Sequence, residues 1–214
     1  MEENQQRKGT TTVGIVCKDA VVMAADKRAT MGYLIANKNV EKIFKITDNI
    51  ALTIAGFASD GQVLARLLRA EMDLYRYNTG VEPSLTAASN LLATIVFERA
   101  KSYMPYVVQL IMGGIDENNE YALYTIDMGG SIIKEDMYYS TGSGSPMAFG
   151  VLEDSYKENM TTEQGAELAI KALASALKRD AGTGEGVEVI IIDKKGYRKL
   201  EKEKVNAVLK PKLE

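Results

Sequence analysis

The absence of histidine limits the chemistry that this chain can perform. None of its 214 residues is a histidine, which excludes Ser-His-Asp and Cys-His catalysis as well as metal centres ligated by histidine. An enzyme of this sequence that works near neutral pH must take its base from a carboxylate, from a lysine of lowered pKa or from its own amino terminus. Any nucleophile in this chain depends on one of these three bases.

Three local patterns contain residue types that can carry chemistry, and each has a structural explanation. Cys17 lies in an alternating apolar stretch, which is typical of a buried strand thiol rather than a reactive one. The pair Ser175 and Lys178 matches a pattern of penicillin-recognising enzymes, but it falls inside a predicted helix and lacks that pattern's companion motifs. The glycines of residues 182–186 precede a strand, whereas a phosphate-binding loop precedes a helix, so they indicate a flexible connection.

The composition is that of a globular protein with little attraction for polyanions. The chain is 46% hydrophobic and 26% charged, and 26 basic against 29 acidic residues give a net charge of −3. This balance argues against nucleic acid or a membrane surface as a partner. Residues 1–9 are polar, unlike a signal peptide, and no apolar run approaches the roughly 18 residues of a membrane helix. We expect a cytoplasmic protein of one domain that needs no metal or cofactor.

In the first half of the chain, apolar alternation predicts strands and a longer period predicts two helices. The strands are predicted over residues 11–17, 20–25, 33–36, 43–46 and 50–55. The first helix is predicted to begin at Ser59 with a capping box closed by Gln62, and to stop at Gly80. The second is predicted to begin at Ser84 and to end before Pro105, antiparallel to the first.

The second half repeats this order of strands followed by a helix pair. Strands are predicted over residues 107–115, 121–127 and 131–139, and a closing hairpin over residues 187–192 and 197–200. Between them, Ser145 is predicted to be the N-cap of a third helix, with Pro146 at its first position, and Thr161 with Gln164 to cap a fourth. The tail from Glu201 is expected to be partly helical. The order predicts two antiparallel sheets that face each other, each covered by a helix pair.

Several short motifs, in order along the chain, are more informative than any one of them. They are GTTTVG at residues 9–14, AADKRAT at 24–30, Lys42, AG at 55–56, GSG at 142–144 and RDAGT at 179–183. Together they resemble the proteasome β subunits of the archaeal type, from about Gly9 to the last hairpin. The resemblance implies the α+β fold of the N-terminal nucleophile hydrolases, a four-layer αββα sandwich.

The resemblance further implies a threonine endopeptidase that is made as a zymogen. Cleavage by the chain itself between Gly9 and Thr10 would remove residues 1–9 as a propeptide and leave residues 10–214 as the catalytic domain. Thr10 would then supply both the nucleophilic Oγ and, in its free α-amine, the base. Such an amine has a pKa of about 7.7–8.0, which suits a base at neutral pH.

Three further residues match positions of the family that assist the attack by the threonine. Lys42 would lower the pKa of the Thr10 hydroxyl. Asp26 would hold that lysine charged and aimed. Gly56 would offer its backbone N–H as the oxyanion hole.

Three more residues match positions that orient the threonine. These are Ser143, Asp180 and Thr183, which would orient the amine and hydroxyl of Thr10. The family more often has serine where this chain has Thr183, so the hydroxyl is retained.

The resemblance also implies how substrate binds. An extended peptide would lie along a strand edge near Thr30 and Gly56, held by main-chain hydrogen bonds. Five uncharged residues match the primary specificity pocket and predict cleavage after hydrophobic residues: Ala29, Val40, Phe44, Ile54 and Ala58.

The partners implied are other proteasome subunits. Two seven-membered β rings would stack between rings of α subunits, which in turn would bind a regulatory ATPase ring, and unfolded proteins would be the substrates.

Two alternatives to this function stay open. One is a non-catalytic subunit of the same fold, which would be expected to lose Thr10, Lys42 or Asp26. The other is a different N-terminal nucleophile amidohydrolase, including a bacterial relative in which the threonine directly follows the initiator methionine.

Overall fold

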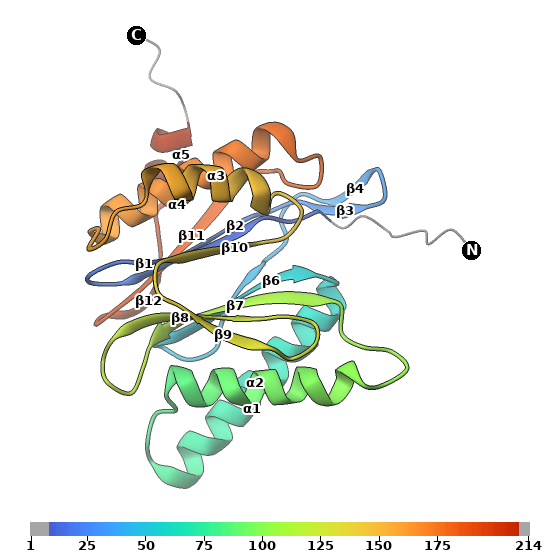
Figure 1. Ribbon diagram of the computed structural model, residues 1–214, viewed down its shortest axis with the longest axis vertical. Helices are drawn as coiled ribbons and strands as arrows, with labels where there is room; N and C mark the ends of the chain where they lie inside the picture. Colours follow the sequence, from blue (N-terminus) through green and yellow to red (C-terminus); the bar gives the residue numbers. More distant parts are fainter. Residues whose placement is uncertain (1–8, 210–214) are drawn as a thin grey trace.

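Two five-stranded antiparallel sheets lie face to face, and helices cover the outer side of each (Figure 1). The predicted α+β class and the αββα layer order are therefore confirmed. This computed structural model describes residues 9–209. Residues 1–8 of the predicted propeptide and residues 210–214 lie outside the described residues.

The first sheet contains the start of the described chain and has the strand order β10-β1-β2-β11-β12. Its strands are β1 (Thr12–Val16), β2 (Val21–Asp26), β10 (Tyr138–Thr141), β11 (Val187–Asp193) and β12 (Gly196–Lys199). The helices on its outer side are α3 (Ser145–Ser155), α4 (Thr162–Arg179) and α5 (Lys202–Leu209).

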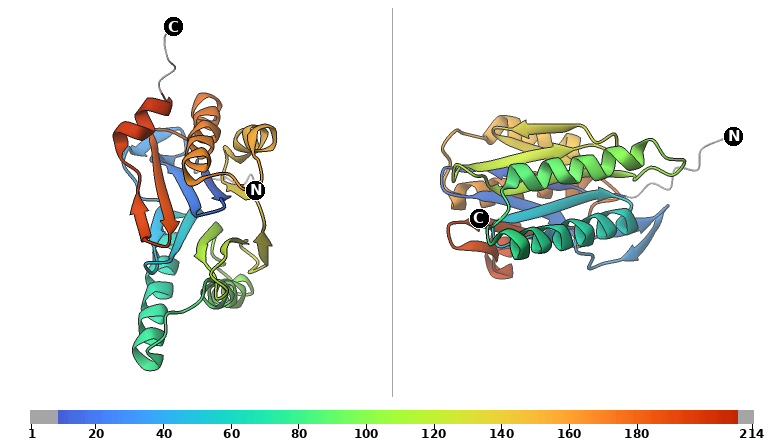
Figure 2. Two further views of the ribbon diagram at one scale, coloured as in Figure 1. Left: turned by 90° about the vertical axis from the view of Figure 1, so that its left-hand side faces the viewer. Right: turned by 90° about the horizontal axis from the view of Figure 1, so that it is seen from below.

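The second sheet is made from one continuous stretch of chain, in the order β5-β6-β7-β8-β9. Its strands are β5 (Ile43–Lys45), β6 (Ile50–Gly56), β7 (Val108–Ile115), β8 (Tyr121–Ile126) and β9 (Ile132–Glu135). Helices α1 (Ala58–Thr79) and α2 (Leu85–Ala100) lie side by side on its outer face, as Figure 2 shows from below. A separate hairpin of β3 (Ala29–Met31) and β4 (Leu34–Asn37) precedes this sheet.

The alternation of side chains along β2 explains why the layers stack. Met23 packs between the sheets in one cluster with Ile111 of β7. Its neighbours Val22 and Ala24 point the other way, into the cluster under α3 and α4. Each aliphatic side chain buried in this way stabilises the fold by about 1.5–3 kcal/mol, so both faces of the strand hold the sheet in the sandwich.

The start of α1 differs from the prediction. Phe57 is the N-cap residue and makes no side-chain cap, and Ser59 lies inside the first turn. The predicted capping box of Ser59 and Gln62 is therefore wrong. The reason is the sheet: the backbone N–H of Phe57 still donates to the carbonyl of Val107, at 2.9 Å, so the chain turns directly from β6 into the helix.

The other predicted helix starts agree with the structure more closely. The capping box of α4 is confirmed, since the hydroxyl of Thr161 accepts the N–H of Gln164 and the Gln164 side chain accepts the N–H of Thr161. Ser84 caps α2 as predicted. Helix α3 is capped by Gly144, so Ser145 is its first residue and not its N-cap.

The strand predicted over residues 131–139 is two strands in different sheets. β9 pairs with β8 in the second sheet, whereas β10 pairs with β1 in the first. The chain crosses between the sheets at Asp136 and Met137, and the carbonyl of Met137 accepts the N–H of Val16 at 2.7 Å. This crossing brings the segment after β10, with Ser143, alongside the start of β1.

Candidate active site

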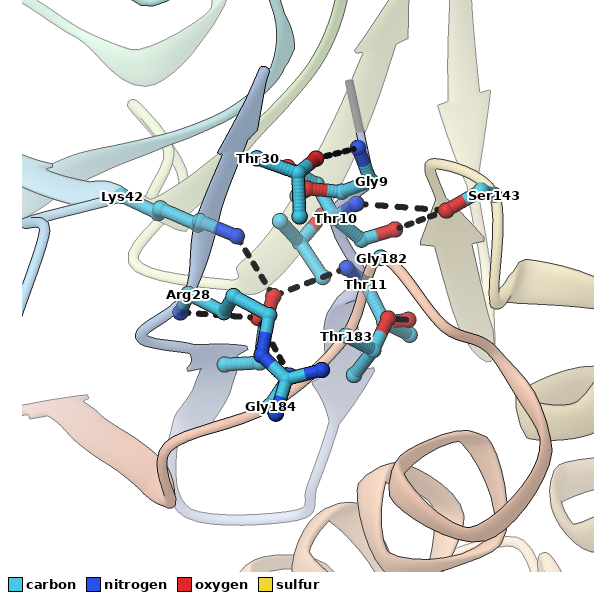
Figure 3. Close-up of polar contacts among 12 residues, drawn as sticks. Gly9, Thr10, Thr11, Arg28, Thr30, Lys42, Ser143, Gly182, Thr183 and Gly184 are labelled. Atoms are coloured by element: carbon cyan, nitrogen blue, oxygen red, sulfur yellow. Dashed lines mark hydrogen bonds and ion pairs between the residues drawn. The ribbon is translucent and has the colours of Figure 1, made fainter. Parts of the chain in front are cut away.

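Thr10 lies just before β1, with 6% of its surface exposed. Its backbone N–H donates to Oγ of Ser143 at 3.2 Å, and its own hydroxyl donates to the carbonyl oxygen of Gly9 at 2.7 Å (Figure 3). The hydroxyl is thus within hydrogen-bond reach of the peptide group that the sequence predicts to be cut. The backbone N–H of Gly9 in turn donates to Oγ1 of Thr30, at 2.9 Å.

Asp26 ends β2 and is buried, with its carboxylate surrounded by donors. Oδ1 accepts the ammonium of Lys42 at 2.7 Å and the N–H of Thr11 at 3.0 Å. Oδ2 accepts the backbone N–H groups of Arg28 at 3.1 Å and Gly184 at 3.0 Å. Such a fully used carboxylate fixes the lysine, the chain beside Thr10 and the loop before β11 relative to one another.

Lys42 precedes β5 and is also buried, with 6% of its surface exposed. Burial lowers the pKa of its ammonium, and the charge of Asp26 and the hydrogen bond to it oppose that effect. Because Asp26 belongs to the first sheet and Lys42 leads into the second, the ion pair links the two sheets. Lys42 and Thr10 line the same pocket.

A chain of hydroxyls and one carboxylate lies behind Thr10. Oδ2 of Asp180, the residue that ends α4, accepts the hydroxyls of Ser143 at 2.6 Å and of Thr183 at 2.5 Å. Since Thr183 donates to Asp180, it accepts from the hydroxyl of Thr11, at 2.6 Å. Ser143 therefore contacts Thr10 directly. Thr183 instead contacts Thr11, and its hydrogen-bond link to Thr10 runs through Asp180 and Ser143.

Gly56 lies at the end of β6 with φ near 125°. This is a conformation that side chains rarely adopt, and a Cβ here would meet the carbonyl oxygen of Val107 at 2.1 Å. Glycine is required here, and the backbone lines the same pocket as Thr10. This placement suits an N–H aimed at a substrate carbonyl.

All six residues predicted to bind substrate line one pocket of about 240 Å³ beside Thr10. They are Ala29, Thr30, Val40, Phe44, Ile54 and Ala58. The pocket opens between the β3–β4 hairpin and the start of α1, so segments far apart in sequence form its wall. That these residues bind substrate stays a prediction.

The sequence did not identify five further residues of this pocket. They are Arg28, Met31, Ala36, Glu41 and Gln62. One of them had a usable signal: Gln62 follows Ala58 by four residues, and residues four apart share one face of a helix. The others lie on the hairpin or beside matched residues, where local pattern does not indicate direction.

The weaker patterns have structural roles. Burial, followed by the charge of Asp19, raises the pKa of Cys17 to about 12, so this thiol is a core residue. Ser175 and Lys178 lie inside α4. Residues 182–186 form a connection before β11.

Among residues 9–209, no acidic and cysteine side chains cluster as a metal site would require. No helix of that part of the chain is long and apolar enough to cross a bilayer.

Comparison with known proteins identifies the family of this chain. A family model described as "Proteasome subunit" matches residues 6–192. Three archaeal proteins named "Proteasome subunit beta" are similar over most of both chains. The protein of Methanospirillum hungatei JF-1 is 49% identical over 208 residues, which are 97% of this chain and 98% of the relative. That of Methanopyrus kandleri is 48% identical over 209 residues (97% and 99%), and that of Ferroglobus placidus 47% over 202 residues (94% and 95%). The chain therefore belongs to the proteasome subunit family, as a subunit of the β type.

Proposed function

We propose that this β-type subunit is a threonine endopeptidase whose nucleophile is Oγ1 of Thr10. The observation that carries the proposal is the 2.7 Å hydrogen bond from that hydroxyl to the carbonyl oxygen of Gly9. It holds the nucleophile beside the one peptide group whose cleavage would free the Thr10 amine. Lys42 lines the same pocket and supplies a positive charge where negative charge develops.

The first reaction is self-cleavage of the Gly9–Thr10 bond. Oγ1 of Thr10 attacks the carbonyl carbon of Gly9, a C–O bond forms and the C–N bond breaks. The hydroxyl proton ends on the released Thr10 nitrogen, and the product is an ester between Gly9 and the Thr10 hydroxyl. Water then hydrolyses this ester to a Gly9 carboxylate and the free hydroxyl. Residues 1–9 leave as a propeptide, and residues 10–214 remain.

In the mature chain the same hydroxyl attacks a substrate peptide bond. The free Thr10 amine takes the hydroxyl proton as Oγ1 bonds to the substrate carbonyl carbon, and Gly56 N–H stabilises the resulting oxyanion. The amine returns the proton to the leaving peptide nitrogen. Water, deprotonated by the same amine, then hydrolyses the acyl ester and restores the hydroxyl.

The roles of the surrounding residues follow from their contacts. The ammonium of Lys42, held by Asp26 at 2.7 Å, stabilises the alkoxide character of Thr10. Ser143 accepts the N–H of Thr10 at 3.2 Å and donates to Asp180 at 2.6 Å, which orients the amine lone pair. Thr183 completes this network from the side of Thr11.

The pocket beside Thr10 supports a chymotrypsin-like preference for hydrophobic residues. Val40, Phe44 and Ile54 give its wall an apolar character, and burying an apolar side chain there is favourable. The peptide would extend past Thr30 and Gly56 through main-chain hydrogen bonds, a mode that tolerates many sequences.

The family supports an assembly in which the activity is enclosed. We propose two seven-membered β rings stacked between α rings, with a regulatory ATPase ring that delivers unfolded proteins of the cytoplasm. The simultaneous presence of Thr10 and Lys42 in one pocket, with Asp26 paired to Lys42, favours a catalytic subunit over a purely structural one. A leader before Thr10 distinguishes this chain from the bacterial relatives in which threonine follows methionine.

The test is Thr10→Ala, co-assembled with α subunits of the same organism. Intact-mass measurement should show wild type beginning at Thr10 and the variant still carrying residues 1–9, with hydrolysis of a hydrophobic fluorogenic peptide lost. Thr10→Ser is the matched control, because it keeps the hydroxyl and should keep both reactions. A trimmed and active Thr10→Ala particle contradicts the proposal.

A further inference from the structure

Gly182, in the loop between α4 and β11, lies directly against Gly9 (Figure 3). A Cβ on Gly182 would lie 2.1 Å from Cα of Gly9 and 3.0 Å from its nitrogen. A Cβ on Gly9 would lie 1.8 Å from Cα of Gly182. The two residues thus pack backbone on backbone, and neither tolerates a side chain while the other is in place.

The backbone of Gly182 gives no separate reason for glycine. Its φ is outside the left-handed region, unlike that of Gly56 or Gly142. The three atoms nearest to a Cβ at Gly182 all belong to Gly9, the third at 3.2 Å. Apart from the chain neighbours of Gly182, no other atom lies closer than that. Gly9 is therefore the group that excludes a side chain at this position.

The loop that carries Gly182 is anchored and cannot easily move away. The N–H of Gly182 donates to Oδ1 of Asp180 at 3.3 Å. Directly before Gly182, the carbonyl of Ala181 accepts from the guanidinium of Arg28 at 2.9 Å, and two residues after it the N–H of Gly184 donates to Asp26 at 3.0 Å. Since ordinary van der Waals contact begins at 3.4 Å, a methyl on Gly182 must displace Gly9 by more than 1 Å.

Gly9 is the residue that contributes the carbonyl of the proposed self-cleavage. Its N–H donates to Thr30 and its carbonyl accepts from the hydroxyl of Thr10. Gly182 packs against its Cα as a third contact. Once the Gly9–Thr10 bond is cut, Gly9 leaves, and Gly182 then borders the space that Gly9 occupied. The contact therefore exists only in the uncut chain.

We propose that Gly182 is a positioning residue for propeptide removal that the mature peptidase does not need. By packing on Gly9 it sets the carbonyl carbon within reach of Oγ1 of Thr10. The inference rests on the proposed self-cleavage at Gly9–Thr10. It differs from the roles of Asp26, Lys42 and Ser143, whose contacts persist after cleavage.

The test compares two forms of the Gly182→Ala variant, each assembled with α subunits of the same organism. One is the full chain from Met1. The other begins at Thr10, released from a fusion partner whose removal leaves that residue at the amino terminus. Propeptide removal is followed by intact mass over time, and activity by hydrolysis of a hydrophobic fluorogenic peptide.

The full-length variant should lose its propeptide about 100-fold more slowly than wild type, because a displacement of about 1 Å between reacting groups costs about that factor. The variant that begins at Thr10 should hydrolyse peptide within about 2-fold of the wild-type chain made in the same way, because substitutions away from packed contacts have small effects. This activity also shows that the variant folds and assembles.

Two further glycine variants serve as controls. Gly142→Ala places a Cβ 2.1 Å from the carbonyl oxygen of Thr10, an atom that survives cleavage, so it should impair both forms. Gly150→Ala lies on exposed α3 with nothing within 4 Å of its Cβ, so it should affect neither. Slow propeptide removal combined with normal peptide hydrolysis is therefore expected only for Gly182→Ala among these three variants.

Two results overturn the inference. One is removal of the propeptide from full-length Gly182→Ala at the wild-type rate. The other is an equal loss of activity in the form that begins at Thr10, which would make Gly182 part of the mature site. If full-length wild type is itself not cut at Gly9–Thr10, the proposed function fails and the inference with it, and the wild-type arm makes this failure distinguishable.

Discussion

Nζ of Lys42 lies 2.7 Å from Oδ1 of Asp26, with 7% of the lysine side chain and none of the aspartate side chain exposed. Asp26 ends β2 of the first sheet and Lys42 directly precedes β5 of the second, so the ion pair ties the two sheets together beside the pocket that Thr10 lines. A buried pair of this kind leaves an uncompensated charge when one partner is removed. Stability and activity are therefore linked at this contact.

Asp26→Asn should destabilise the subunit by about 3–5 kcal/mol, because it leaves the Lys42 ammonium buried without its counter-charge. It should also abolish peptide hydrolysis. Chemical unfolding and a fluorogenic peptide assay measure the two effects. Asp48→Asn is the matched control: Asp48 pairs with Lys45 at the surface with 78% of its side chain exposed, and such pairs contribute about 0–1 kcal/mol. Equal effects of the two variants contradict the prediction.

The pH dependence of peptide hydrolysis should be bell-shaped. On the acid side, kcat/KM should rise as the Thr10 amine loses its proton, around its ordinary pKa of about 7.7–8.0. On the alkaline side, activity should fall as Lys42 loses its charge. Because burial lowers the pKa of Lys42, this fall should come at lower pH than for an exposed lysine.

Deprotonation of Lys42 does not itself destabilise the fold, whereas ionisation of Cys17 and Tyr197, whose pKa values burial raises to about 12, does lower stability at alkaline pH. Between the lowered pKa of Lys42 and the ordinary lysine value, the unfolded chain binds more protons than the folded one, so the contribution of Lys42 to stability rises with pH. Lys42→Arg provides the control, since arginine stays charged, and its residual activity should lack the alkaline fall. An unchanged alkaline limb in Lys42→Arg contradicts the assignment.

The specificity pocket predicts a preference that one charge can reverse. Val40→Lys places an ammonium on the pocket wall, which should lower kcat/KM for peptides cleaved after leucine by about 10-fold or more and raise it for cleavage after glutamate. Peptides with leucine, arginine or glutamate before the cleaved bond measure this. Val81→Lys adds the same charge at an exposed position outside the pocket and should change nothing. Wild type that prefers arginine or glutamate refutes the pocket assignment.

The two predicted capping boxes differ in a way that stability measurements can test. Thr161→Ala removes the side-chain cap of α4 and should lower the free energy of unfolding by about 1 kcal/mol. Ser59→Ala should be nearly neutral, because Ser59 caps nothing. Both are measured by denaturant unfolding in the Thr10→Ala background, which keeps the propeptide uniform. Comparable losses from both variants contradict the assignment of the caps.

The layers of the fold were predictable because apolar alternation is a local property. The buried positions of β2 and the capping box of α4 follow from neighbours a few residues apart. The site residues needed more: Asp26 and Lys42 are ordinary charged residues by type, and only the order of motifs along the chain indicated their pairing. The observed ion pair of 2.7 Å then gives that order a physical meaning.

What the sequence did not predict depends on contacts between distant segments. The alternation over residues 131–139 has one period on both sides of Asp136, so it does not indicate that β9 and β10 join different sheets. The contact of Thr183 with Thr11, at 2.6 Å, and that of Gly182 with Gly9 likewise arise only once the loop before β11 has folded onto the start of β1.

The first sheet draws its strands from three separate parts of the chain, residues 12–26, 138–141 and 187–199. On a ribosome, Thr10 emerges among the first residues, but Asp180 and Thr183 follow only after about 10–35 s of translation, at about 5–20 residues per second. During that interval Ser143, which accepts the N–H of Thr10, lacks the Asp180 carboxylate to which it donates. This order of synthesis delays completion of the network around Thr10 until the polypeptide is almost complete.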